Sequence, residues 1–175
     1  IPAPDPYRNP SGPGTTGEAL EAELERQGPE SVAAFLAEPS GGSSSGAVVP
    51  SPAYWRRVVE TCRRHGVLWI ADEGMCGMGR TGRWFAFEHF DVVPDILVLG
   101  KGLNAGAVPL SAVVASREVA ETIAAGSGAF RHAQTYSHHP ALCAAGLAVV
   151  RRLRRDGLVE RAAVLEDPLF AALAR

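Results

Sequence analysis

Short apolar runs recur along the chain, each bounded by glycine, proline or charged residues. Runs of this length between turn residues are typical of strands buried in a parallel sheet. Glycine or a polar or charged residue follows each run directly, so each strand has a defined end. The pattern predicts strands at Ser31–Ala37, Val67–Ala71, Asp95–Leu99 and Leu110–Ala115.

Longer stretches between these runs carry helix signals. Pro52 is a favoured first helical residue, Gly66 a favoured stop and Ser116 a favoured cap. The Gly/Ser-rich segment 41–46 has the composition of a linker but is too short to separate domains. Helices alternating with strands indicate an α/β fold, with an open, mainly parallel sheet flanked by helices. The predicted helices are Gly17–Arg26, Pro52–Gly66, Ser116–Ala125, Ala141–Arg155 and Gly157–Arg175, the last with a break at Pro168.

Composition argues against several classes of protein. The net charge of -2 gives no electrostatic case for binding nucleic acid or an anionic membrane. No apolar run reaches the length of a membrane span, and no secretory signal pattern is visible. Cys62, Cys76 and Cys143 are an odd count without metal-type spacing, which predicts reduced thiols in a cytoplasmic protein.

Lys101 is the only lysine among 17 basic residues. Arginine replaces lysine on a solvated surface, but it does not lose its proton and attack a carbonyl carbon. Two interpretations of the count remain open, a leftover surface lysine and a Schiff-base former. The position of Lys101 between two glycines, directly after an apolar run, disfavours simple surface exposure.

Three charged residues, Glu38, Asp72 and Lys101, follow three different predicted strands. Ligands of open α/β sheets bind at the carboxyl ends of the strands. Pyridoxal 5'-phosphate (PLP) needs an amine that binds its aldehyde and a carboxylate that keeps its pyridine nitrogen protonated. Lys101 fits the first role, with the freed amine as general base and acid, and Asp72 fits the second. The plainer alternatives are an Asp72–arginine pair and, for Glu38, a solvated strand end.

Two further motifs have other interpretations. Gly77–Gly82 matches G-x-G-x-x-G, but a dinucleotide site needs the first glycine directly after the strand and a helix starting in the loop. A loop bent around a neighbouring site or chain fits these glycines better. In segment 132–140, Thr135 and Ser137 precede a helix N-terminus, a combination suited to phosphate. His132, His138 and His139 lack further ligands at metal spacing, so we predict no metal site.

Residues 68–116, LWIADEGMCGMGRTGRWFAFEHFDVVPDILVLGKGLNAGAVPLSAVVAS, resemble the signature region of the class III aminotransferases, which have the type I PLP fold. The resemblance extends back to FLAEP at 35–39 and forward to TYSHHPALCAAGLAVV at 135–150. It implies that Lys101 binds the PLP aldehyde as an imine, that Asp72 pairs with the pyridine nitrogen and that Met75 lies near the phenolic oxygen. Gly74 replaces the family's usual ring-stacking valine.

The resemblance also implies partners and boundaries. Glu38 resembles the glutamate that pairs with a substrate-binding arginine, and Thr135 resembles the threonine that reaches the cofactor phosphate of a partner subunit, so a homodimer is expected. Family members are longer, so we interpret the chain as a fragment: residues 1–155 as a partial PLP-binding large domain and residues 156–175 as the start of a C-terminal small domain. Transamination between an amino donor and an oxo acceptor is the leading expectation. An aminomutase, a decarboxylase, a non-catalytic remnant and a nucleotide-binding domain are the alternatives.

Overall fold

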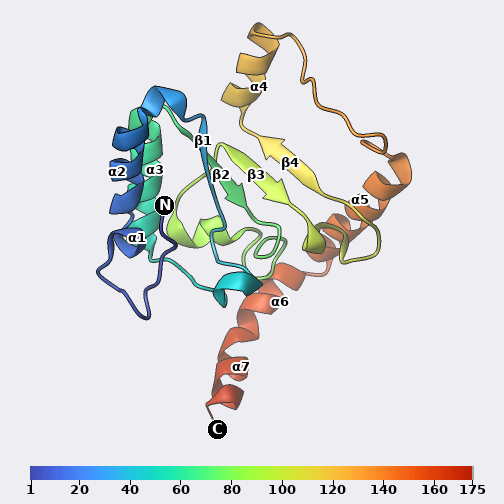
Figure 1. The fold of residues 1–175 in the computed structure, drawn as a ribbon. Coiled ribbons are helices and arrows are strands. Elements are labelled where there is room, and N and C mark those ends of the chain that lie inside the picture. The colour runs from blue at the N-terminus through green and yellow to red at the C-terminus, as the bar shows by residue number, and fades with distance from the viewer. Residues whose placement is uncertain (175) are drawn as a thin grey trace.

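The computed structural model describes residues 1–174 and contains one four-stranded sheet in the order β1-β2-β3-β4. β1 pairs with β2 and β2 with β3 in parallel, whereas β4 is antiparallel to β3. The register sets Ala37 beside Ala71 and Asp72 beside Val98. The predicted α/β fold with a mainly parallel sheet is therefore confirmed (Figure 1). The strands are β1 (Ala34–Ala37), β2 (Leu68–Asp72), β3 (Ile96–Leu99) and β4 (Ala112–Ala115).

The helices from residue 18 onward follow the predicted pattern, with ends that differ by a few residues, whereas the short helix α1 was not predicted. They are α1 (Pro13–Thr16), α2 (Glu18–Gln27), α3 (Pro52–His65), α4 (Arg117–Ala125), α5 (Pro140–Arg155), α6 (Leu158–Val164) and α7 (Glu166–Leu173). Four 3-10 turns are added, which are η1 (Pro29–Ser31), η2 (Ser43–Ser45), η3 (Ala86–Phe90) and η4 (Lys101–Asn104). The first part of the predicted strand Ser31–Ala37 lies in η1 and the residues after it, so β1 is shorter than expected.

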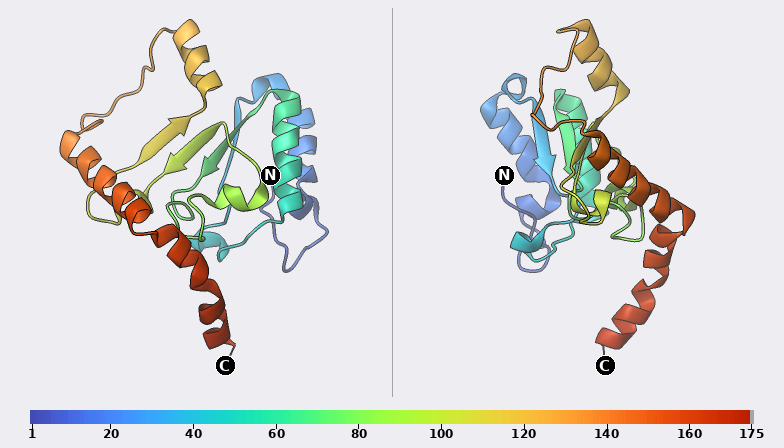
Figure 2. Two further views of the ribbon diagram at one scale, coloured as in Figure 1. Left: turned by 180° about the vertical axis from the view of Figure 1, so that it is seen from behind. Right: turned by 90° about the vertical axis from the view of Figure 1, so that its right-hand side faces the viewer.

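The main core lies between α3 and one face of the sheet (Figures 1 and 2). The Ser51 side chain accepts a hydrogen bond from the Tyr54 N–H at 3.1 Å, which caps α3, and Gly66 ends the helix with φ 68°. Trp55 of α3 packs against Trp69 of β2, with ring centroids 5.3 Å apart. Each large aromatic side chain buried in this way stabilises the fold by about 1.5–3 kcal/mol.

The opposite face of the sheet is open. Alternate residues of β2 point to the two faces, so Trp69 and Ala71 are buried in the core while Asp72 is half-buried on the other side. On the open side, Leu36 of β1 is 59% exposed and Val113 of β4 is 68% exposed. The end of β2 therefore presents Asp72 toward the uncovered face.

The C-terminal helical region is interrupted at Leu165, and the predicted break at Pro168 is wrong in position. Proline lacks the N–H that would bond to the carbonyl four residues earlier, and its ring clashes with that carbonyl. For Pro168 that residue is Val164, the last residue of α6. Pro168 itself lies in the first turn of α7, where its missing N–H is not needed. Figure 1 shows α7 leading away from the sheet.

Candidate functional site

Asp72 and Lys101 lie at the carboxyl ends of the neighbouring strands β2 and β3. Asp72 ends β2, and its Oδ1 atom accepts a hydrogen bond from the Gly74 N–H at 2.9 Å. Oδ2 of Asp72 has no hydrogen-bond partner among residues 1–174. Lys101 begins η4 after the extended residue Gly100 and has φ 39°, in the left-handed region. This conformation is unfavourable for a residue with a side chain and is concentrated at functional sites.

The two side chains face the same small space beside Gly74. A β-carbon placed on Gly74 would lie 2.9 Å from Asp72 Oδ1 and 3.8 Å from Lys101 Nζ. A carboxylate and a primary amine thus border one space that no side chain of residue 74 fills. This donor set fits PLP, which needs an amine at one end of its ring and an anion at the other. The roles of Asp72, Gly74 and Lys101 remain predictions.

Lys101 also borders a cavity of about 670 Å³ between the glycine-rich loop, η4 and the α5–α6 region. Lys101 is exposed, contrary to the interpretation of its sequence context. The predicted cofactor contact Met75 lines the same cavity and is 38% exposed. The other lining residues are Ser40, Gly41, Ala47, Cys76, Gly77, Met78, Gly79, Arg80, Thr81, Gly102, Leu153, Leu158 and Ala162.

The glycines of the 77–82 loop serve close packing against α6. Gly79 and Gly82 have φ 88° and 79°. β-Carbons at these positions would lie 3.0 Å from Val159 and 2.8 Å from Ala163. Turns and bends follow up to η3, and no α-helix begins within the loop. The structural context of a dinucleotide fingerprint is therefore not met, and the loop bends around a helix of its own chain.

Glu73 is a buried carboxylate that the sequence analysis did not single out. Its side chain is 1% exposed, although it directly follows the half-buried Asp72. Its oxygens accept hydrogen bonds from the Ala86 and Phe87 N–H groups of η3 and from the Cys76 thiol. Burial, reinforced by the charge of Glu73, raises the pKa of Cys76 to about 12, so the thiol stays protonated and remains a donor.

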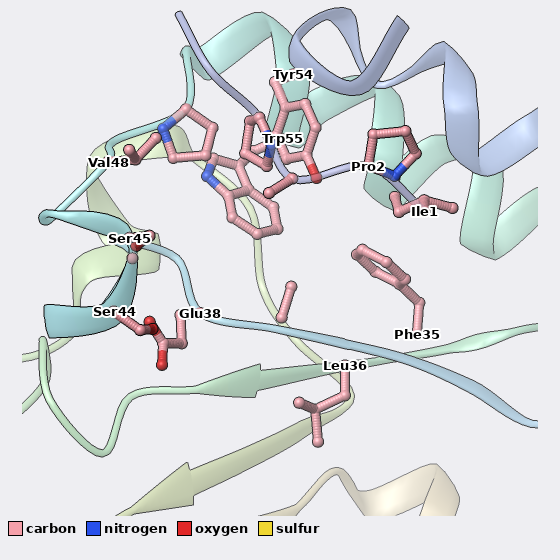
Figure 3. Close-up of a pocket in the computed structure, with 15 residues that line it drawn as sticks. Ile1, Pro2, Phe35, Leu36, Glu38, Ser44, Ser45, Val48, Tyr54 and Trp55 are labelled. Atoms are coloured by element: carbon pink, nitrogen blue, oxygen red, sulfur yellow. The ribbon is translucent and has the colours of Figure 1, made fainter.

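Glu38 lines a different cavity, of about 380 Å³, at the edge formed by β1. Figure 3 shows Glu38 beside Ser44, while Phe35, Tyr54 and Trp55 lie on the other side of the chain that leaves β1. Burial raises the pKa of the Tyr54 phenol to about 12. Gly41 lines both cavities, whereas Glu38 lines only this one and Lys101 only the other. The substrate-binding role of Glu38 remains a prediction.

Thr135 is not brought to Lys101 within this chain. It is exposed, in the connection from α4 to α5, which passes beyond β4 in Figure 1. The neighbouring hydroxyl of Ser137 accepts a hydrogen bond from the Gln134 N–H at 3.0 Å. A role of Thr135 toward the cofactor phosphate therefore needs a second subunit and stays a prediction.

Other features bear on the remaining expectations. All three cysteines are free thiols. Within residues 1–174, no cluster of three or more His, Cys, Asp or Glu side chains is arranged to bind a metal ion. None of the helices described is both long and apolar enough to span a bilayer.

Comparison with known sequences places these residues in context. The family described as "Aminotransferase class-III" matches residues 1–175. An uncharacterized aminotransferase, YodT, of Bacillus subtilis is 45% identical over 165 residues, which are 92% of this chain and 37% of that protein. The putrescine–pyruvate aminotransferase of Pseudomonas aeruginosa is 40% identical over 144 residues, which are 82% of this chain and 31% of that protein. The chain thus spans about a third of the length of these relatives.

Solved structures show the same similarity. An aminotransferase of Bacillus anthracis superimposes with a TM-score of 0.89 at 33% identity, over 99% of this chain and 40% of that one. An amine transaminase from an uncultivated Pseudomonas species, solved in its PLP-bound form, gives a TM-score of 0.82 at 40% identity, over 87% of this chain and 35% of that one.

Proposed function

Because the chain belongs to the class III aminotransferases, we propose that it forms the lysine-bearing part of an enzyme that transfers an amino group from a small amine or amino acid to a 2-oxo acid or aldehyde. PLP is the proposed cofactor, since the family is PLP-dependent. The relatives are aminotransferases or transaminases, which favours transamination over an aminomutase or decarboxylase reaction. The observation that carries the proposal is the shared space that Asp72 and Lys101 border.

Each of these residues has a defined task. Lys101 Nζ would hold the cofactor through its aldehyde carbon, and as a free amine it would take and return the substrate's α-proton. Asp72, held by the Gly74 N–H through Oδ1, would keep the pyridine nitrogen of the cofactor protonated. Bound PLP supplies an electron sink for the charge that develops when the α-proton leaves. Gly74 and Met75 line the approach to the ring.

We also propose a cytoplasmic homodimer, with Thr135 of each subunit directed at the cofactor phosphate of the other. The exposed position of Thr135 and the three free thiols support this arrangement. Residues 1–155 are proposed as part of the large domain and residues 156–175 as the start of the small domain. The left-handed Gly157 that separates α5 from α6 supports this boundary.

The first test is the visible absorption of the purified protein mixed with PLP. Because these 175 residues span about a third of their relatives, we expect them to bind PLP weakly or not at all by themselves, and we expect a longer protein that contains them to give a band that free PLP lacks. We expect Lys101→Ala to abolish any such band, because no other side chain of these 175 residues is a primary amine. Lys101→Arg keeps the charge and is also expected to lose the band, since arginine does not deprotonate.

A band that persists in both variants would point to the N-terminal amine and contradict the assignment of Lys101. No band in these 175 residues, but a band in a longer protein that contains them, would indicate that the chain is a fragment of the enzyme. No band in either protein would contradict the assignment of PLP. Saturable binding of NAD or ATP by calorimetry would favour the nucleotide alternative instead.

A further inference from the structure

Both carboxylate oxygens of Glu73 and both of its backbone polar groups make hydrogen bonds. Its Oε1 accepts the Phe87 N–H at 2.9 Å, and its Oε2 accepts the Ala86 N–H at 3.0 Å and the Cys76 thiol at 3.1 Å. The two amide donors come from η3, 13 and 14 residues further along the chain. The carboxylate therefore joins the end of β2 to an element that the backbone reaches only after the whole glycine-rich loop.

The Glu73 backbone fixes the start of that loop as well. The Glu73 N–H donates to Val98 O of β3 at 2.9 Å, and Glu73 O accepts the Gly77 N–H at 3.0 Å. A β-carbon on Gly77 would lie 2.8 Å from Glu73 O, so the loop closes on Glu73 only because residue 77 is glycine. Gly74, whose N–H orients the Asp72 carboxylate, lies inside this closed turn.

The negative charge of Glu73 is stabilised without a basic side chain. Glu73 has no ion pair among residues 1–174. Its partners are the first two N–H groups of η3, which have no intrahelical acceptor, and a thiol. A buried carboxylate held only by hydrogen bonds is strongly destabilised when one donor is lost. The geometry of the loop and the ionised side chain therefore depend on one another.

We propose that Glu73 is a positioning residue: by fastening the turn at residues 73–77 to η3, it fixes the Asp72 carboxylate against the pyridine nitrogen of the cofactor. This inference rests on the proposed function. Asp72 ends β2 and Glu73 follows it directly, with Glu73 buried and Asp72 half-buried, so a shift of the Glu73 side chain would move Asp72 through the backbone that they share. In this proposal Asp72 contacts the pyridine ring of the cofactor, whereas Glu73 does not.

The test is the dissociation constant of two ligands for Glu73→Gln. One ligand is PLP, and the other is an analogue in which carbon replaces the ring nitrogen. Glutamine keeps the size but turns an NH₂ group toward an N–H donor of η3, so one amide loses its acceptor. We expect the dissociation constant of PLP to rise at least about tenfold, which is the usual effect of losing a residue that orients a group in contact with the ligand. The dissociation constant of the analogue should change less than about threefold, because it has no ring nitrogen for Asp72 to bind.

Glu88→Gln is the matched control. Glu88 caps the same 3-10 helix through the Phe85 N–H at 2.9 Å, and among residues 1–174 its side chain has no hydrogen bond to the glycine-rich loop. Its glutamine variant keeps an acceptor for the Phe85 N–H. Both ligands should bind this variant within about twofold of the unchanged protein. Equal weakening of both ligands in Glu73→Gln would indicate a purely structural role and overturn the inference, as would unchanged binding of PLP.

A second pair of variants covers the case in which Glu73→Gln does not fold. Cys76→Ala removes one donor to the carboxylate and should weaken PLP but not the analogue, while Cys76→Ser restores a donor and should restore PLP binding. If Cys76→Ala weakens the binding of both ligands equally, or if Cys76→Ser does not restore the binding of PLP, the inference is overturned. If neither these 175 residues nor a longer protein that contains them binds either ligand, the proposed function fails together with the inference. If one of them binds PLP and the variants do not discriminate, only the inference on Glu73 fails.

Discussion

At the scale of single residues, the backbone of Lys101 is the least relaxed feature of the site. Its φ of 39° costs about 1–2 kcal/mol for a residue with a β-carbon, and surrounding contacts must hold it there. Gly102 permits this turn, because a β-carbon there would lie 3.0 Å from Met78 Cβ. Gly102 therefore lets the glycine-rich loop approach the turn closely, whereas the space beside Gly100 is open.

Gly82→Ala is predicted to destabilise the protein. The φ of 79° is unfavourable for alanine, and the new methyl group would lie 2.8 Å from Ala163 of α6. Strain and overpacking together should lower the free energy of unfolding by about 2–4 kcal/mol. Thermal unfolding measures this change, with Gly46→Ala as control.

Gly46 has a similar φ of 73° but open space around it, so alanine there should cost only the backbone strain of about 1 kcal/mol. Equal losses in the two variants would mean that contact with α6 does not explain Gly82.

Residue chemistry was predictable where a single position is unusual. Lys101 stands out as the only lysine after a strand, and Asp72 as a carboxylate at the end of the preceding strand. Glu73 could not be found in this way, because its partners Ala86 and Phe87 donate backbone N–H groups, which carry no sequence signal. Only the folded path of the loop reveals that one of two adjacent acids is buried.

At the scale of elements, α2 and α3 are joined by a cluster around Glu21. Its carboxylate contacts His65 Nε2 at 2.6 Å, Arg64 at 3.0 Å and the Thr61 hydroxyl at 3.1 Å. The hydrogen bond from His65 contributes most to lowering the pKa of Glu21 below its ordinary value of 4.5. A lowered carboxyl pKa stabilises the fold above the ordinary pKa, and this stabilisation disappears as pH falls through the folded-state pKa.

Glu21→Gln should therefore lower the unfolding temperature at pH 7 and have progressively less effect below about pH 4.5. Glu25→Gln on the same helix is the control, since Glu25 is exposed and has no ion pair among residues 1–174. Thermal unfolding from pH 7 to pH 3 measures both. A gap between Glu21→Gln and the unchanged protein that stays constant across this range would contradict the assignment.

Element positions were more predictable than their directions and ends. Apolar runs located all four strands, but β4 has the same pattern whether it runs parallel or antiparallel. The sequence predicted a helix break at Pro168, but the structure has it at Leu165. The reason is that Pro168 cannot bond to the carbonyl of Val164, four residues earlier, and clashes with it. Helix starts were more accurate where a cap exists, as at Ser51 and Ser116.

At the scale of the whole molecule, apolar side chains are exposed over one face of the sheet and along α7. Leu36 and Val113 lie on the sheet, and Phe170 on α7 is 62% exposed. Exposed apolar surface with unpaired strand edges promotes association. We expect these 175 residues, expressed by themselves, to self-associate, and light scattering coupled to size-exclusion chromatography measures this. A monodisperse monomer at micromolar concentration would contradict the expectation.

The whole molecule also explains which predicted site residues meet. Asp72, Gly74 and Lys101 come together because adjacent parallel strands end at one edge of the sheet. Glu38 lines the cavity at the outer edge of β1, and Thr135 lies in the connection beyond β4. The meeting of adjacent strand ends therefore does not bring either residue to Lys101. The roles proposed for Glu38 and Thr135 therefore need partners that residues 1–174 do not bring to them.

Lys101 is both unique and accessible, and this has a practical consequence. A reagent that modifies ε-amino groups has one side-chain target in the whole polypeptide, at the mouth of the cavity. A fluorophore or a borohydride-reduced adduct attached to Lys101 would therefore give a signal from a single known position beside the cavity. Intact mass spectrometry, after subtraction of labelling at the amino terminus, would count the occupied fraction directly.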